Sequence, residues 1–122
     1  MSRTILTGSV ILGVFALQSV PSHAAATQIS VASDPSARYQ LLSLSKLPNG
    51  NLQVLTRRDG RSGTSFARRE VNCSAMTFRY LGEGDTLKQA QRNTPNRGRM
   101  SEAFRDSISG EVSRFACRRS RR

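Results

Sequence analysis

The chain has 122 residues, with 19 Lys or Arg against 8 Asp or Glu, and a net charge of +11 at pH 7. Its length is enough for one domain and too short for two. The single histidine, His23, lies in an N-terminal segment that we expect to be removed. The remaining chain would have no imidazole, which excludes Ser-His-Asp, Cys-His and histidine-metal chemistry.

Residues 1–24 have the order of a bacterial signal peptide. Arg3 precedes an apolar segment at 5–17, and Ser22 and Ala24 are small residues at the two positions that signal peptidase recognises. About 20 apolar residues are needed to span a bilayer, and this segment is shorter, so we expect cleavage rather than a membrane anchor. The mature protein would be exported, either periplasmic or secreted, with no transmembrane segment.

Both cysteines, Cys73 and Cys117, lie in the mature chain. In an exported protein an even number of cysteines predicts a disulfide, because the compartment is oxidising. The bond would close a loop of about 45 residues, for which the loop-entropy model predicts about 4 kcal/mol of stabilisation. Two thiolates without a nearby histidine are half of a zinc ligand set, so we expect no metal and no cofactor.

Four extended segments follow one another through the first half of the mature chain. They cover residues 39–46, 52–57, 64–73 and 76–81. Turn-forming residues at 47–50, which include Asn-Gly, and at 58–63 separate the first three. The last segment has the clearest period of two, with Met76, Phe78 and Tyr80 on one face. This succession predicts an antiparallel meander.

Helix and loop residues follow the last predicted strand. Asp85 can cap a short helix at 86–91, and residues 93–99 contain Pro and Gly and are predicted to be loop. Residues 100–106 can form a further turn of helix.

A closing helix is predicted at 110–118, with Ser109 as its cap. Its apolar face would hold Val112, Phe115 and Ala116, and Cys117 would lie near its end. The disulfide would therefore join this helix to the sheet.

These elements predict a small α+β domain at 38–118, an antiparallel β-meander sheet with one or two short helices and one disulfide. Residues 25–37 are mostly small and polar and are predicted to be a flexible lead-in. Residues 119–122 form a basic tail.

Arginine dominates the charge of the mature chain, with 16 arginines and only two lysines. Removal of Arg3 leaves 18 basic against 8 acidic residues, a net charge of +10. The guanidinium fork suits phosphate and carboxylate groups, so a polyanionic partner is predicted: an acidic polysaccharide, an envelope surface or an acidic protein. The candidate anion-binding residues are Arg57, Arg58, Arg61, Arg68, Arg69, Arg118, Arg119, Arg121 and Arg122.

Two alternatives to a specific polyanion partner bear on this prediction. The positive charge could reflect genome composition and solubility alone. Nucleic-acid readers place aromatic side chains within the basic face, whereas the aromatics here fall mostly on faces assigned to the core. We therefore do not expect sequence-specific nucleic-acid recognition.

No motif selects a catalytic site. Ser43 and Lys46 match a Ser-x-x-Lys pattern of acyl-transferring enzymes, but the supporting motifs are absent and a hairpin strand explains them. Glu83 and Asp85 supply too few oxygens for a calcium loop, and no pair of carboxylates stands out as a glycosidase pair. We expect the protein not to be an enzyme.

The order of elements resembles a group of small exported bacterial proteins typified by the surface-adhesin protein E domain. In both, a meander leads to a cysteine, here Cys73, followed by an aromatic-rich strand at 76–81 and a Gly-containing turn at 82–84. The closing segment at 107–117 also ends in a cysteine, although the Pro and Trp of that group are missing here. The resemblance implies the fold and, for the better-known member, adhesion to host proteins.

The function expected from the sequence is a non-enzymatic exported interaction module. It would hold an anionic partner with arginines from the 57–69 region and the C-terminal tail. One alternative is a secreted enzyme inhibitor or a small carboxylate-based hydrolase, and another is a structural envelope component. Charge-driven binding would weaken steeply with ionic strength, whereas inhibition by a loop in a cleft would not.

Overall fold

The computed structural model describes residues 8, 9, 11, 13, 14 and 27–122. Most of the predicted signal peptide, with its cleavage site and His23, lies outside these residues. Within the described ranges, no helix has the length and apolar character needed to cross a membrane. The elements are β1 (Thr27–Ile29), β2 (Arg38–Lys46), β3 (Leu52–Gly60), β4 (Gly63–Asn72), β5 (Thr77–Gly84), α1 (Leu87–Gln91), β6 (Ser101–Glu102) and α2 (Ile108–Ser120).

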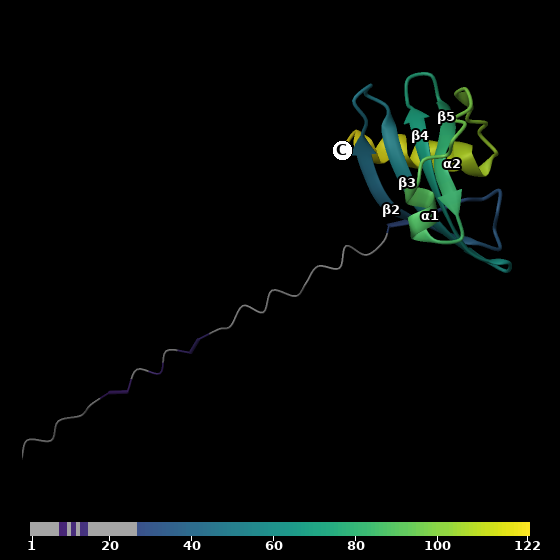
Figure 1. The fold of residues 1–122 in the computed structure, drawn as a ribbon. Coiled ribbons are helices and arrows are strands. Elements are labelled where there is room, and N and C mark those ends of the chain that lie inside the picture. The colour runs from purple at the N-terminus through teal and green to yellow at the C-terminus, as the bar shows by residue number, and fades with distance from the viewer. Residues whose placement is uncertain (1–7, 10, 12, 15–26) are drawn as a thin grey trace, which may run out of the picture.

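The strands form one antiparallel sheet whose spatial order is the order of the chain (Figure 1). The predicted β-meander with short helices and one disulfide is therefore confirmed. The turn between β2 and β3 uses Gly50 at a φ of +87°, a conformation that glycine adopts without strain. The next turn is tighter than predicted, because β3 and β4 remain paired up to Gly60 and Gly63.

The two helices cover opposite faces of the sheet, with α2 behind it and α1 in front in Figure 1. Neighbouring residues on a strand point to opposite faces. Val54, Arg69 and Tyr80 are register partners on the face that α2 covers. On the α1 face, Arg68 lies between its partners Leu55 and Gly82.

The main core lies between the sheet and α2. Its members are Ile29, Val31, Tyr39, Leu41, Leu52, Val54, Val71, Val112, Ala116 and Cys117. On the other face α1 comes very close to β5, and a Cβ atom at Gly82 would overlap the carbonyl oxygens of Ala90 and Arg92. Only glycine allows this approach of helix and strand.

The segment predicted as a flexible lead-in is ordered from Thr27 onward, so that prediction was wrong for the described part. Ile29 pairs with Tyr39 of β2, and Ile29 and Val31 are buried in the core. Glu111 of α2 accepts hydrogen bonds from the backbone amides of Ala32 and Ser33 at 2.9 and 3.1 Å. Two apolar residues were too few to show a strand period, and the pairing partner of Ile29 lies on another strand.

The second half of the chain differs in its details. Residues 100–106 were predicted as helix but contain β6 and a turn, because Ser101 pairs with Phe78 of β5. Thr86 rather than Asp85 caps α1, and α2 begins two residues earlier than predicted. Its cap is Ser107, whose hydroxyl oxygen accepts from the Gly110 amide at 3.0 Å. The predicted cap Ser109 is instead a buried residue of the first turn.

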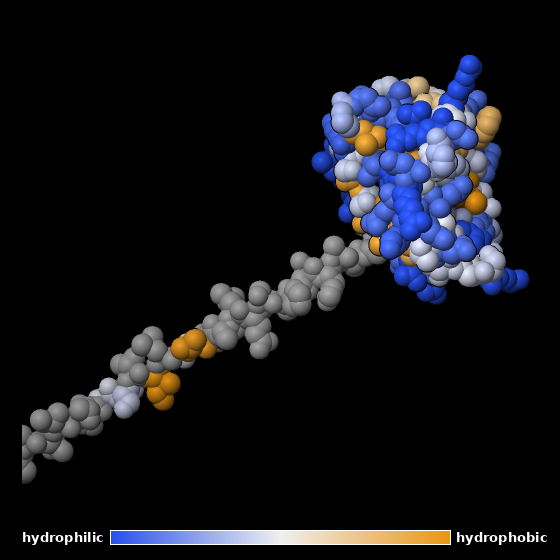
Figure 2. Space-filling model, viewed as in Figure 1, coloured by the Kyte–Doolittle hydropathy of each residue, from blue (hydrophilic) through white to orange (hydrophobic). Residues whose placement is uncertain are grey.

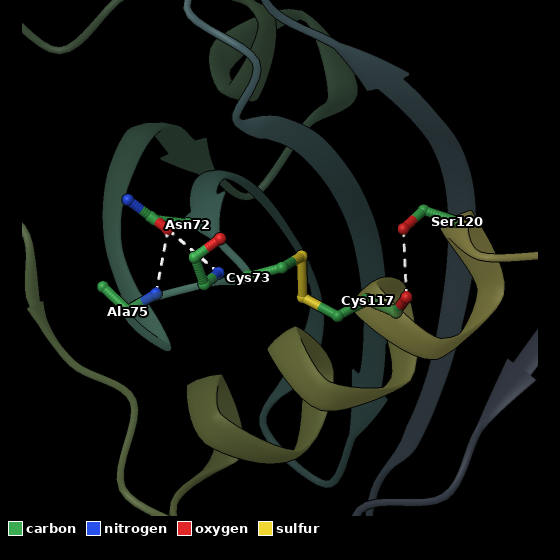
Figure 3. The surroundings of a disulfide bond; sticks show 6 residues. Asn72, Cys73, Ala75, Cys117 and Ser120 are labelled. Atoms are coloured by element: carbon green, nitrogen blue, oxygen red, sulfur yellow. Dashed lines mark hydrogen bonds between the residues drawn. A yellow bond between two sulfur atoms is a disulfide. The ribbon is translucent and has the colours of Figure 1, made fainter.

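The predicted disulfide between Cys73 and Cys117 is confirmed (Figure 3). The two Cα atoms are 5.7 Å apart, within the range of about 4.4–6.8 Å that disulfides adopt. The side-chain oxygen of Asn72 accepts from the amides of Ser74 and Ala75, which shapes the turn after β4. The bond ties the end of β4 to the last turns of α2.

A buried carboxylate holds the β2–β3 turn to the sheet. Glu70 of β4 accepts hydrogen bonds from the side-chain amides of Asn51 and Asn49 at 2.7 and 2.9 Å. Arg79 of β5 forms an ion pair with it at 2.8 Å. Burial alone would raise the pKa of Glu70, but these three partners together lower it below the ordinary value.

We expect Glu70→Gln to destabilise the fold at pH 7 by about 1–3 kcal/mol, because Arg79 loses its charged partner. A lowered folded pKa means that the carboxylate stabilises the fold above its unfolded pKa of about 4.3, and that this contribution is lost as pH falls through the folded pKa. The gap in unfolding free energy between wild type and variant should therefore narrow from pH 7 to pH 3. Urea unfolding measures it, with the exposed Glu102→Gln as control; a gap independent of pH would contradict the assignment.

Candidate functional site

The nine candidate arginines do not form one exposed face. Arg68 and Arg69 are buried, with 8% and 3% of their surface exposed, so the prediction that they belong to an exposed basic cluster was wrong. β4 is an inner strand with a helix over each face, and consecutive residues must point to opposite faces. Each of the two arginines is therefore covered by a different helix.

Arg68 fixes α1 to the sheet. Its Nε donates to the Ala90 carbonyl oxygen at 2.9 Å, and one terminal nitrogen donates to the Asn93 side chain at 2.8 Å. The same nitrogen reaches the carbonyl oxygens of Leu81 and Gln91 at 3.3 and 3.4 Å. Burial, and then the charge of Arg97, lowers the pKa of Arg68. Its role in the fold is structural.

Arg69 faces α2 and is surrounded by hydroxyl groups. Its Nε donates to Ser109 Oγ at 3.1 Å, one terminal nitrogen donates to Thr56 Oγ1 at 3.0 Å, and the other lies 3.5 Å from Tyr80 Oη. The guanidinium carbon is 5.0 Å from the centre of the Tyr80 ring, within cation–π distance. Among the described residues, no carboxylate forms an ion pair with Arg69.

Arg57 and Arg58 are both paired with aspartates. Arg57 binds Asp59 at 3.1 Å, and Arg58 binds Asp34 at 2.9 Å. Hydrogen bonds from Arg58, and then from Tyr39, lower the pKa of Asp34. Burial, and then the hydrogen bond to Asp34, raises the pKa of Tyr39 to about 12. These pairs leave little free charge on β3.

The exposed candidates are Arg61 in the β3–β4 turn and the four arginines at the end of α2. We call Arg118, Arg119, Arg121 and Arg122 the C-terminal arginine cluster. Three of them, Arg118, Arg119 and Arg122, line a hollow of about 180 Å³ together with Phe115 and Thr27. Within α2, the spacing of Phe115, Arg118 and Arg119 (i, i+3 and i+4) places them on one side of the helix, and Arg122 lines the same hollow from beyond its end.

The C-terminal arginine cluster is separated from the arginines of β3 and β4 by the length of α2. Ile108, the first residue of α2, lines a pocket with Arg58 and Arg69, whereas the cluster occupies the other end. A helix of 13 residues is about 20 Å long. The sequence left open whether the two groups of arginines share one face, and the structure places them at opposite ends of α2.

The pocket at the first residue of α2 has a volume of about 340 Å³. It lies on the α2 face of the sheet. Its lining includes Tyr39, Thr56, Phe66, Arg69, Tyr80 and Ile108. Sequence reasoning placed Tyr80 in the core and did not single out Thr56, whereas Tyr80 is more than a third exposed. The sequence contained one signal for the buried arginine. Side chains alternate between the two faces of a strand, so of two adjacent arginines in β4 one had to point toward the core.

The other surfaces of the described residues have fewer features of a binding site. The face that carries α1 is mostly hydrophilic, with scattered apolar residues (Figure 2). Phe104, which was assigned to the core, is 63% exposed but stands in a turn. Across residues 27–122 and the few described before them, no three His, Cys, Asp or Glu side chains come together as a metal site.

No protein-family model, curated protein or solved structure matches this chain. The resemblance to the surface-adhesin protein E group stays a prediction, and the function is inferred from the geometry of the described residues.

Proposed function

We propose that the protein is an exported, non-enzymatic interaction protein that holds an acidic polysaccharide at its C-terminal arginine cluster. The observation that carries this proposal is the hollow beside Phe115, where the exposed Arg118 and Arg119 of α2 come together with Arg122, which follows the helix. Within the described chain no carboxylate is within ion-pair distance of them. Their charge is available to a partner.

The chemistry of the cluster suits a polymer of anionic groups. Each guanidinium can donate two parallel hydrogen bonds to a carboxylate or sulfate, and binding releases counterions from the polymer. Arg118 and Arg119 lie in the last turn of α2 and Arg122 follows it, so successive anionic groups of one chain can contact successive arginines. The single aromatic ring, that of Phe115, is half-buried, which favours a polysaccharide over stacked nucleic-acid bases.

Replacement of all four arginines of the cluster by serine should weaken retention on immobilised heparin about 10- to 100-fold at about 50 mM salt. Exposed ion pairs contribute about 0.2–1 kcal/mol each. Four of them therefore contribute about 0.8–4 kcal/mol, and a 10- to 100-fold loss corresponds to about 1.4–2.7 kcal/mol within that interval. Wild-type retention should itself be lost at about 500 mM salt because of screening.

The matched control changes four other exposed arginines to serine: Arg92, Arg97, Arg99 and Arg105. It removes the same net charge but leaves the cluster intact, and it should reduce retention by less than about 3-fold. Equal losses in the two variants would show that net charge alone causes retention, and would leave solubility as the explanation of the arginines.

A further inference from the structure

The pocket beside Arg69 lies at the other end of α2 from the C-terminal arginine cluster. Its volume of about 340 Å³ falls in the range of about 300–1,000 Å³ that small-molecule sites occupy. Tyr39, Tyr80 and Ile108 contribute aromatic and apolar surface, and Thr56, Ser65 and Arg69 contribute polar groups. Apolar walls with a few polar groups are typical of a site for a small organic molecule.

Arg69 is the buried charged group of this pocket, and it forms no ion pair with a described residue. The described part of the chain buries three charged side chains, Arg68, Arg69 and Glu70. Glu70 has Arg79 as its partner, and Arg68 has the carbonyl groups around α1. Arg69 has only hydroxyl groups, although an isolated buried charge is unfavourable.

The hydrogen bonds of Arg69 leave donors for a ligand. A guanidinium group carries five N–H bonds. In Arg69 one of these is directed at each of the hydroxyls of Ser109, Thr56 and Tyr80, so each terminal nitrogen keeps one further N–H. These two N–H groups, one on each terminal nitrogen, are donors that a carboxylate can accept from.

The rim of the pocket limits the charge of the ligand. Glu83 and Asp85, both exposed, line the pocket, and the carboxylate of Asp34 already neutralises Arg58. These acidic groups repel a polyanion more strongly than a single carboxylate, whose repulsion the charge of Arg69 offsets. We infer that the pocket binds a small monocarboxylate with a flat apolar body, its carboxylate on Arg69 and its body against the aromatic wall.

The test is a titration of the oxidised protein with phenylacetate, followed by NMR signals of the Arg69 Nε–H and the pocket aromatics. We expect saturable shifts with a Kd on the order of 1 mM, as for a ligand of this size. Phenylacetamide keeps the ring but has no charge, and acetate keeps the charge but has no ring. Each should bind at least about 10-fold more weakly.

Two variants locate the site. Arg69→Met should weaken phenylacetate binding at least about 10-fold by removal of the charged donor. Because that change also removes the Ser109 contact and could loosen α2, Ala67→Leu provides a second variant: it fills the pocket and leaves the bonds of Arg69 in place. It should abolish the shifts while the protein stays folded.

Absence of saturable shifts up to about 50 mM phenylacetate, or equal binding of phenylacetamide or acetate, would overturn the inference, as would undiminished binding by folded Ala67→Leu. The experiment is separable from the heparin test. Both pocket variants keep the C-terminal arginine cluster and should keep heparin retention, and the four-serine variant of the cluster should still bind phenylacetate.

Discussion

Arg68→Met is expected to destabilise the protein by about 2–4 kcal/mol and to free α1 from the sheet. Methionine can fill the space of the arginine stem, but it cannot donate to the buried carbonyl oxygen of Ala90, and the carbonyl oxygen of Leu81 keeps only its bond from the Thr94 amide. Each buried polar group that loses its partner costs about 1–3 kcal/mol. Urea unfolding measures the total change, and amide hydrogen exchange locates it.

The exchange measurement distinguishes local from global loss. The amides of Ala90 and Thr94 donate to Thr86 and Leu81 in the structure, so both should exchange faster in Arg68→Met than the amides of β3 and β4. Arg99→Met is the matched control: Arg99 is exposed, and its replacement should change stability by less than about 0.5 kcal/mol. If the two variants were equally stable, Arg68 would not be holding α1.

The sheet was predictable because its signals are local. The Asn-Gly turn, the alternation at 64–73 and the aromatic period at 76–81 each fix a strand without knowledge of its neighbours. β1 and β6 have three and two residues, and they exist only because longer strands supply their hydrogen-bond partners. These contacts join residues that are far apart in the sequence, so no short segment of the sequence can predict them.

The prediction of which arginines are exposed was incomplete for a different reason. A cluster of arginines in the sequence indicates positive charge, but the face on which each lies depends on the sheet. Arg58 forms an ion pair with Asp34, which is distant in sequence, and Arg69 donates a hydrogen bond to Ser109 of α2. What remains free is the end of the chain, where Arg121 and Arg122 lie past the last helical residue and no neighbouring element covers them.

Arg68 and Arg69 also show how the two helices are attached to the sheet. The first donates to the C-terminal carbonyl groups of α1, and the second donates to Ser109 in the first turn of α2. A pair of adjacent residues on an inner strand thus fixes one helix on each face. Their hydrogen bonds offset part of the cost of burying two guanidinium groups.

Reduction of the disulfide is expected to lower the free energy of unfolding by about 2–5 kcal/mol, with a fall in Tm of roughly 10–30 °C. The bond between Cys73 and Cys117 restricts the unfolded chain, because it closes a loop between positions 44 residues apart. It also holds the end of α2 that carries the C-terminal arginine cluster. Thermal unfolding of the oxidised and reduced protein, followed by circular dichroism, measures the difference.

The comparison of oxidised and reduced protein isolates the effect of the disulfide bond, because the described chain has no free cysteine and both sulfur atoms remain after reduction. Cys73→Ser/Cys117→Ser should be at least as unstable as the reduced protein, since Cys117 is buried in the core and a serine hydroxyl there lacks the apolar contacts of sulfur. Equal melting of oxidised and reduced protein would mean that the other contacts of α2, the packing of Val112 and Ala116 and the hydrogen bonds of Ser109 and Glu111, hold the helix without the disulfide. In that case heparin retention should survive reduction, whereas detachment of α2 should disperse the cluster and reduce it.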